Sequence, residues 1–189
     1  MTNESTQTIG TKLAIIIFDS RYGNTQKIAN SIQAGVREAG IDVSCLATSD
    51  VDINSLKSYD LICVGGPTQY RTASETMQNF LRSIEKFNLS GKFGFVFDTR
   101  RDSILAGSAA KFIEERLRKL GLKIVSPGQS AIIFDPQPEE KRGESESKDA
   151  WKERRHQRER LRDGEEEKFE KIGFEVGTSL LARGKVIQE

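Results

Sequence analysis

Five short apolar runs alternate with helical patterns along this chain, and that alternation restricts the possible folds more than any other feature. The runs are rich in β-branched and aromatic residues, as strands are. They lie at residues 13–18, 43–47, 61–65, 93–97 and 130–134. Continuous apolar strands separated by helices are typical of a parallel sheet that is buried on both faces. We therefore predict an α/β fold, with a doubly wound, five-stranded parallel sheet and helices on both faces.

Apolar residues at helical spacing indicate four amphipathic helices in the remaining segments. Residues 72–75, Thr-Ala-Ser-Glu, predict a capping box that begins the second helix, and Gly121 is placed to end the third. The segment at 51–56 is expected to hold only a short element. The four apolar stripes are Ile28, Ile32 and Val36; Met77, Phe80, Leu81 and Ile84; Phe112, Ile113, Leu117 and Leu120; and Phe169, Ile172, Val176 and Leu180.

The overall charge and the longest apolar run exclude some classes of function. The 29 basic and 28 acidic residues nearly cancel, so no overall field favours nucleic acid, a membrane or an acidic substrate. The longest apolar run is too short to span a bilayer, and the polar residues 1–12 do not resemble a signal peptide. We therefore expect a cytoplasmic protein that does not contact membranes.

Residues that usually perform acid–base, nucleophilic or metal chemistry are scarce in this chain. His156 is the only histidine, and it lies in a dense charged run. Cys45 and Cys63 lie in apolar runs, and their spacing matches neither a zinc site nor a redox Cys-x-x-Cys pair, so we expect two buried, reduced thiols. We predict no metal site and no catalytic side chain, and any chemistry would come from a cofactor.

A highly charged segment interrupts the α/β pattern before the last helix. Residues 139–168 contain ten basic and eleven acidic residues, with Trp151 and Leu161 as the only large apolar side chains. Such a composition cannot form a core of its own. We interpret residues 136–164 as a charged insertion in a single domain that spans 12–189.

The insertion has two interpretations, and a polar tail at 1–11 precedes the domain. Blocks of opposite charge that neutralise each other usually form a solvated helix or a disordered segment, which is the interpretation we favour. The second interpretation is a contact with nucleic acid or an acidic partner through the arginines of 152–162. Deletion of the insertion would test whether it serves as a docking surface.

Residues 18–29, FDSRYGNTQKIA, form a strand-to-helix turn that is suited to hold a phosphate. Such a turn presents free backbone N–H groups and the positive end of the helix dipole. Asn24 stands where a Walker loop needs lysine, and no dinucleotide G-x-G-x-x-G motif follows the first run. The third run ends in Gly-Gly-Pro rather than the Asp of a receiver domain, and Cys63 and Arg71 are too far apart for a cysteine phosphatase. The remaining phosphate ligands are Ser20, Tyr22, Gly23, Asn24 and Thr25.

This turn resembles the FMN-phosphate loop of the flavodoxin family, which reads T/S-x-T/Y-G-N-T. Residues 61–71, LICVGGPTQYR, are similar to the exit of strand three in that family, where an aromatic flanks the flavin ring. Residues 97–101 and 107–110 resemble its third flavin loop and the start of the next helix. The resemblance implies strand order 2-1-3-4-5, FMN as cofactor, and electron transfer through the bound flavin. It places at the cofactor Ser20, Arg21, Tyr22, Gly23, Asn24, Thr25, Pro67, Thr68, Gln69, Tyr70, Thr99 and Arg100.

The candidate loops also depart from the family pattern. Typical flavodoxins are acidic around the flavin and carry an aromatic residue in the third loop. Residues 98–102 of this chain contain no aromatic residue. Guanidinium groups near a flavin favour its reduced, negatively charged forms, so we predict a less negative reduction potential than in acidic flavodoxins. The alternative is that the arginines point to solvent or pair with Asp19, Asp98 and Asp102. The arginines concerned are Arg21, Arg71, Arg100 and Arg101.

We expect an electron carrier that exchanges electrons with a redox partner protein or a small-molecule acceptor. One alternative is an NAD(P)H- or quinone-linked flavin reductase, in which the arginines would attract a phosphorylated nicotinamide or a quinone oxygen. Another is a flavodoxin-fold binding module that has lost the flavin and uses the charged insertion as its working surface. Turnover with added NAD(P)H would identify the first alternative, and failure to bind FMN would identify the second.

Overall fold

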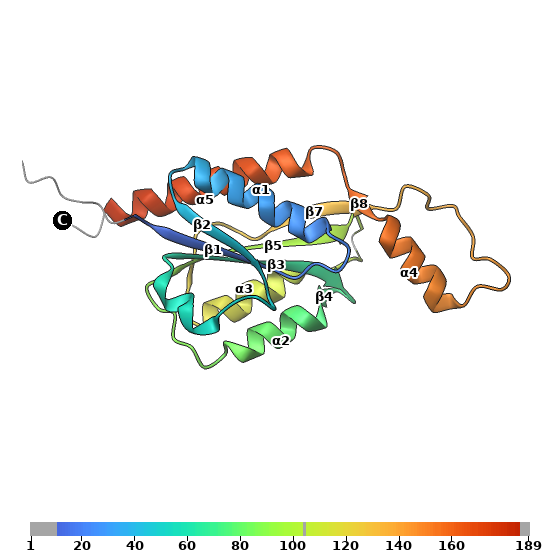
Figure 1. The fold of residues 1–189 in the computed structure, drawn as a ribbon, viewed down its shortest axis with the longest axis horizontal. Coiled ribbons are helices and arrows are strands. Elements are labelled where there is room, and N and C mark those ends of the chain that lie inside the picture. The colour runs from blue at the N-terminus through green and yellow to red at the C-terminus, as the bar shows by residue number, and fades with distance from the viewer. Residues whose placement is uncertain (1–10, 104, 186–189) are drawn as a thin grey trace, which may run out of the picture.

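The computed structural model describes residues 11–103 and 105–185, and its centre is a sheet between two layers of helices (Figure 1). The predicted tail at 1–11 lies outside the described residues, except for Thr11. Among the helices of the described segments, none is both long enough and apolar enough to cross a bilayer.

Five parallel strands form the main part of the sheet. β1 (Leu13–Phe18) lies between β2 (Asp42–Ala47) and β3 (Leu61–Gln69), and β5 (Phe93–Arg101) and β7 (Gln129–Phe134) follow on the far side of β3. Numbered by themselves, these strands have the order 2-1-3-4-5, which confirms the predicted doubly wound fold. β3 and β5 run past the predicted apolar runs, because their ends continue as paired backbone that places Pro67 beside Thr99.

Three strands of two residues extend this sheet and were not predicted. β6 (Lys123–Ile124) pairs with β5, and β8 (Arg160–Leu161) runs antiparallel to β7. β4 (Thr72–Ala73) folds back on β3, so Thr72 belongs to a strand pair and not to a capping box. The cap of α2 (Glu75–Ser83) is instead Ser74, whose Oγ accepts a hydrogen bond from the Met77 N–H at 3.3 Å.

Helices cover both faces of the sheet, as the apolar stripes predict. α1 (Asn24–Glu38) and α5 (Glu165–Lys185) lie on one face, and α2 and α3 (Ala109–Lys119) lie on the other (Figure 1). Each pair of helices packs its apolar residues against the sheet in a separate buried cluster. The short element predicted at 51–56 is a 3₁₀ helix, η1 (Ile53–Ser58). Both cysteines are free thiols, Cys63 buried and Cys45 partly buried.

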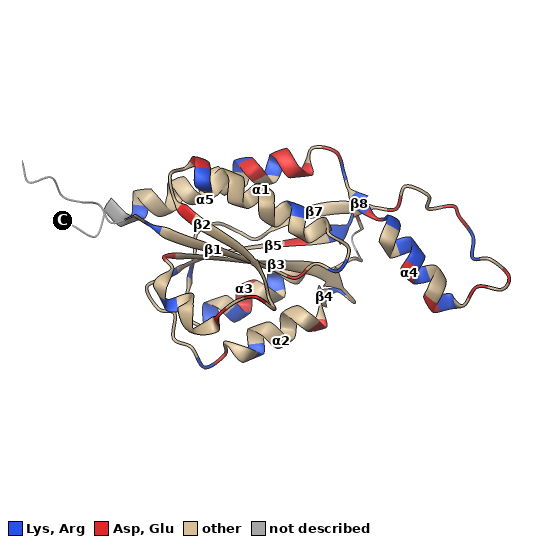
Figure 2. Ribbon diagram, viewed as in Figure 1, with Lys and Arg blue, Asp and Glu red and all other residues tan. Residues whose placement is uncertain are grey.

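The chain between β7 and α5 contains the helix α4 (Lys148–Arg158) and then β8. α4 lies beyond the carboxyl ends of the strands, outside the layers of the sheet domain (Figure 1). Basic and acidic residues occur together along it (Figure 2), and none of its residues is fully buried within the described part of the chain. Leu161, which directly follows in β8, packs into the core under α5. The charged insertion is therefore anchored to the domain at its C-terminal end.

Candidate functional site

A cavity of about 660 Å³ lies at the carboxyl ends of β1, β3 and β5, and α4 forms its remaining wall. In an open α/β sheet this is where ligands bind, at the point where the strand order reverses. Its size is that of a pocket for a small molecule or cofactor. Of the twelve predicted cofactor residues, all except Gly23 line it: Ser20, Arg21, Tyr22, Asn24, Thr25, Pro67, Thr68, Gln69, Tyr70, Thr99 and Arg100.

The turn before α1 leaves backbone donors free for an anion. Gly23 occupies the N-cap position of α1 with φ +86°, a left-handed conformation, and offers no side-chain cap. The Gln26 N–H is already taken, because it donates to Ser20 Oγ at 3.2 Å. Within the described segments, the N–H groups of Asn24 and Thr25 have no acceptor. Two free donors at the positive end of a 15-residue helix are what a phosphate group needs.

The side chains of this turn are partly committed to other contacts. Asn24 Nδ2 donates to the carbonyl oxygen of Glu159 at 2.9 Å, and the hydroxyls of Thr25 and Thr99 lie 2.9 Å apart. Asn24 and Thr25 therefore tie the first loop to the insertion and to the end of β5. Their side chains are thus engaged, whereas their backbone N–H groups have no acceptor within the described residues.

The loop after β3 is strained and presents an exposed aromatic. Tyr70 and Arg71 have φ values of +48° and +71°, unusual for residues with side chains. Gly107 lies so close to Arg71 that a Cβ atom there would collide with its backbone. The conformation is thus held by contact with the next loop, and it leaves the Tyr70 side chain 98% exposed at the rim of the cavity.

Thr68, which lines the cavity, also has a structural role together with Asp98 of β5. The buried Asp98 accepts hydrogen bonds from Thr68 Oγ1, at 3.0 Å, and from the Ala110 N–H, also at 3.0 Å. The Thr68 hydroxyl in turn accepts from the Ala109 N–H at 2.9 Å. Asp98 and Thr68 therefore fix the start of α3 and the spacing of the two loops.

The arginines of the cavity do not pair with the aspartates considered in the sequence. Arg21 pairs with Glu153 at 3.1 Å, and Arg101 pairs with Glu159. The aspartates have other partners: Asp19 accepts from Ser74, Asp98 from Thr68, Ser108 and Ala110, and Asp102 pairs with Arg162. The sequence did not indicate these pairings because both glutamates lie in the insertion, more than fifty positions from their partners.

Arg100 is the arginine of the cavity that keeps an unused donor. Its Nη1 donates weakly to the Gly107 carbonyl oxygen at 3.4 Å. Its Nε is buried and has no hydrogen-bond partner within the described residues. A buried guanidinium N–H without a partner is costly, and an acceptor on a ligand would satisfy it.

The insertion contributes seven of the 21 residues that line the cavity, and the sequence did not predict this contribution. Tyr22 Oη donates to Glu153 at 2.7 Å, and its ring stacks with His156 at a centroid distance of 5.9 Å. The only sequence signal was Trp151, an isolated aromatic in a charged run. The lining residues that were not predicted are Arg101, Ala106, Ile133, Asp149, Trp151, Lys152, Glu153, Arg155, His156 and Glu159.

The contact between Tyr22 and Glu153 shifts the pKa of both groups. The hydrogen bond from Tyr22, with the nearby charge of Arg21, holds the pKa of Glu153 below its usual range. Burial and the same hydrogen bond raise the pKa of Tyr22. At neutral pH the pair is therefore a carboxylate that accepts from a phenol, and the carboxylate neutralises Arg21.

The residues present fit a flavin mononucleotide. The first loop offers two free N–H groups to a phosphate, and the second and third loops flank a cavity large enough for a planar ring. Arg100 and Trp151 line the same cavity, and each has a buried N–H donor, Nε and Nε1, without a partner in the described residues. Flavin carbonyl oxygens and ring nitrogens are acceptors of the matching kind.

Comparison with known proteins agrees with this geometry. The family model described as flavodoxin matches residues 16–148, which is more than half of the chain. The chain belongs to the flavodoxin family. A flavodoxin of Clostridium saccharobutylicum is 34% identical over 116 residues, which are 60% of this chain and 72% of that protein. This flavodoxin-like protein accordingly binds FMN and acts in electron transfer through the bound flavin.

Longer relatives share only part of their length with this flavodoxin-like chain. The flavo-diiron protein FprA2 of Clostridium acetobutylicum is 29% identical over 129 residues, which are 65% of this chain but only 32% of that protein.

Among solved structures, a flavodoxin from the domain Archaea has a TM-score of 0.67 at 23% identity, and the match covers 89% of this chain and 99% of that one. At that identity the structural likeness establishes the fold alone.

Proposed function

We propose that this protein binds FMN with its phosphate on the turn before α1 and its ring between the loops after β3 and β5, and that it carries electrons for a redox partner protein. One observation carries this proposal. Asn24 and Thr25, whose N–H groups are free within the described residues, line the same cavity as Pro67, Tyr70 and Arg100. This supports a phosphate site and a ring site that share one cavity.

Different residues would bind the phosphate and the ring of FMN. Ser20 and the backbone N–H groups of the turn would hold the phosphate, while Pro67, Gln69 and Tyr70 would flank the ring. Thr99 holds the first loop through Thr25, and Arg100 would donate to an acceptor of the ring. The bound flavin supplies the redox chemistry, and the side chains bind it, orient it and limit access of water.

A protein partner suits the exposed rim of the cavity better than nucleic acid does. Tyr70 projects into solvent beside the site and offers an aromatic contact surface. The arginines of α4 that suggested a nucleic-acid contact are largely paired, with Arg154 bound to Glu146 and Arg155 to Asp135. A cytoplasmic location remains a sequence-based prediction, and cell fractionation would test it.

Titration of the apo-protein with FMN tests this function. We expect flavin fluorescence to change with one-to-one stoichiometry, and riboflavin, which lacks the phosphate, to bind at least about tenfold more weakly, since each charge-assisted hydrogen bond contributes about 1.5–3 kcal/mol. Absence of FMN binding would favour the binding module without flavin. Oxidation of NAD(P)H by the loaded protein alone would favour the reductase.

A further inference from the structure

We propose that Trp151 of the charged insertion is the second aromatic contact of the flavin ring, in place of the aromatic that the loop after β5 lacks. This inference rests on the proposed function. The insertion would then be neither a free tail nor a docking arm. It would be the fourth wall of the cofactor site.

The position of Trp151 is the first observation. It is the only tryptophan of the chain, and it lines the same cavity as Pro67, Tyr70 and Arg100. Residues 98–102, by contrast, offer no ring to cover a flavin from the third loop. Tyr70 reaches the cavity from the loop after β3, so the two aromatics come from different walls.

The indole N–H of Trp151 is the second observation. Nε1 is buried and has no hydrogen-bond partner within the described part of the chain. Buried tryptophan N–H groups normally find an acceptor. The indole lines the cavity, and a flavin bound there would bring carbonyl oxygens and ring nitrogens, the acceptors that this N–H lacks, to the same side chain.

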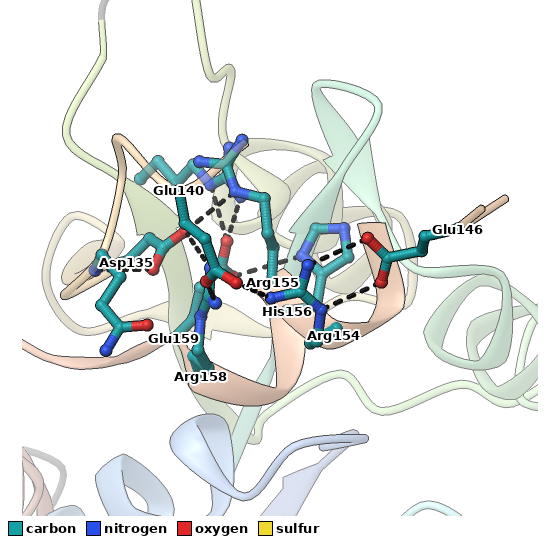
Figure 3. Close-up of polar contacts among 10 residues, drawn as sticks. Asp135, Glu140, Glu146, Arg154, Arg155, His156, Arg158 and Glu159 are labelled. Atoms are coloured by element: carbon teal, nitrogen blue, oxygen red, sulfur yellow. Dashed lines mark hydrogen bonds and ion pairs between the residues drawn. The ribbon is translucent and has the colours of Figure 1, made fainter. Parts of the chain in front are cut away.

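The indole is also held in place by its own neighbours. The guanidinium carbon of Arg155 lies 4.9 Å from the centroid of the Trp151 ring. Arg155 Nε donates to Asp135 at 2.8 Å, and Arg158 approaches the same carboxylate at 3.4 Å (Figure 3). A stacked and anchored cation of this kind orients the ring before a ligand arrives.

Ion pairs hold the whole of α4 in this position. Figure 3 shows Arg154 between Glu140 and Glu146, and His156 beside Glu159 at 3.4 Å. Glu159 also binds Arg101 at the end of β5. These contacts join α4 to the insertion loop before it and to the sheet after it.

Two further contacts fix α4 to the phosphate loop. Glu153 accepts from Tyr22 and pairs with Arg21, and the Glu159 carbonyl oxygen accepts from Asn24. The helix that carries Trp151 is therefore attached directly to the turn that would hold the phosphate. These contacts fix the position of Trp151 relative to that turn.

Affinity measurements on Trp151 variants test the proposal. Removal of a ring that stacks on a base typically costs about 5- to 150-fold in affinity, so Trp151→Ala should weaken FMN binding by at least about fivefold. Trp151→Phe keeps a ring but loses the N–H donor, and we expect an intermediate loss of about three- to tenfold. Lys148→Ala, an exposed residue at the start of α4 that does not line the cavity, is the matched control and should bind as the parent does.

A second readout separates a ring contact from a damaged site. Loss of a contact to the ring should reduce riboflavin and FMN affinity by the same factor, and it should make the bound flavin more fluorescent, because a neighbouring indole quenches it. A loss restricted to FMN would assign the effect to the phosphate loop and overturn the proposal. Unchanged affinity and spectrum of Trp151→Ala would also overturn it while leaving the proposed function intact, whereas a parent protein that binds no FMN would refute the function itself.

Discussion

Gly23 determines the backbone geometry of the first loop. Its φ of +86° lies in the region that residues with a side chain avoid at a cost of about 1–2 kcal/mol. A Cβ atom built on it would meet nothing within 4 Å, so its substitution would change conformational energy without a collision. The residue is thus required for the shape of the turn, although it does not itself line the cavity.

We expect Gly23→Ala to lower the free energy of unfolding by about 1–2 kcal/mol and to weaken FMN binding, because the free N–H groups that follow Gly23 would be misaligned. Gly91 is a matched control, with φ +84° and open space around its Cα. Gly91→Ala should cost similar stability and leave FMN affinity unchanged. Thermal unfolding and FMN titration measure the two effects, and equal affinities of both variants would contradict the expectation.

Arg100 is the residue that we expect to have the largest effect on the reduction potential of the bound flavin. Arg21 and Arg101 are neutralised by Glu153 and Glu159, so their effect on a flavin is reduced. Arg100 has no carboxylate partner within the described residues. The sequence-based prediction of a less negative potential therefore depends mainly on this one guanidinium.

We expect Arg100→Gln to make the reduction potential more negative by roughly 40 mV or more, since about 1 kcal/mol between a charge and the reduced flavin corresponds to roughly 40 mV for one electron. A redox titration of the loaded variant measures it. Arg118→Gln, which removes an exposed arginine of α3 away from the cavity, should leave the potential unchanged. A potential that rises in Arg100→Gln would refute the assignment.

At the scale of elements, α1 and α5 pack through glycines. A Cβ atom on Gly173 of α5 would collide with the Ile32 carbonyl oxygen of α1, and one on Gly35 would collide with the backbone of α5 at Glu170. The two helices therefore approach backbone to backbone. This close approach buries Ile32 and Val36 under α5 and leaves no room for a side chain between the helices.

We expect Gly173→Ala to lower the free energy of unfolding by about 1–3 kcal/mol, although alanine is the better helix former, because the added methyl group overpacks the contact. Lys171→Ala changes an exposed residue of the same helix and should stay within about 0.5 kcal/mol of the parent. Denaturant unfolding measures both. A more stable Gly173→Ala variant would show that α5 can move away from α1.

α4 is an element held by charge, so its position depends on pH. Burial alone would raise the pKa of Asp135, but hydrogen bonds from the Gln137 N–H and from Arg155 and Arg158 outweigh it and hold the pKa at about 2. A carboxyl group with a lowered pKa stabilises the folded state above its unfolded pKa, about 3.9, and this contribution is lost as the pH falls toward 2. The attachment of α4 should therefore persist at neutral and mildly acidic pH.

We expect Trp151 emission to stay constant between pH 7 and about pH 5 and to shift to the red as the pH falls further, when the carboxylates that hold α4 are protonated. Far-UV circular dichroism at each pH separates release of α4 from global unfolding. Asp135→Asn should already show the red-shifted emission at pH 7. A variant with the emission of the parent would show that the Asp135 pairs do not hold the helix.

At the scale of the whole molecule, α4 of the charged insertion lies outside the hydrophobic core but forms part of the cavity. Within the described residues, the two buried clusters contain no residue of α4, whereas the cavity depends on it. We expect replacement of residues 139–158 by a short Gly-Ser linker to leave cooperative unfolding intact and to weaken FMN binding. Unchanged FMN affinity would support the interpretation of the insertion as a tail.

Most of the fold could be predicted because its signals are local. Apolar runs and helical stripes report burial directly, and they located the five main strands and the helices α1, α2, α3 and α5. The predicted start of α2 was wrong. Thr72 fits a capping box by sequence, but in the structure it pairs with Gln69 in a hairpin that no local sequence pattern indicates. The positive φ values of Tyr70 and Arg71 in the loop after β3 were not predicted either, since neither residue is a glycine.

The sequence by itself determined the doubly wound sheet, the strand-to-helix turn at residues 20–25 and the kinship with flavodoxins, because each depends on residues that are close together in the chain. Only the tertiary structure decided where the charged insertion lies and which carboxylates neutralise the arginines. Glu153 meets Arg21, and Glu159 meets Arg101, across long separations in sequence. Ion pairs require only opposite charges within reach, so in a segment of mixed charge many pairings are equally compatible with the sequence, and the folded chain selects among them.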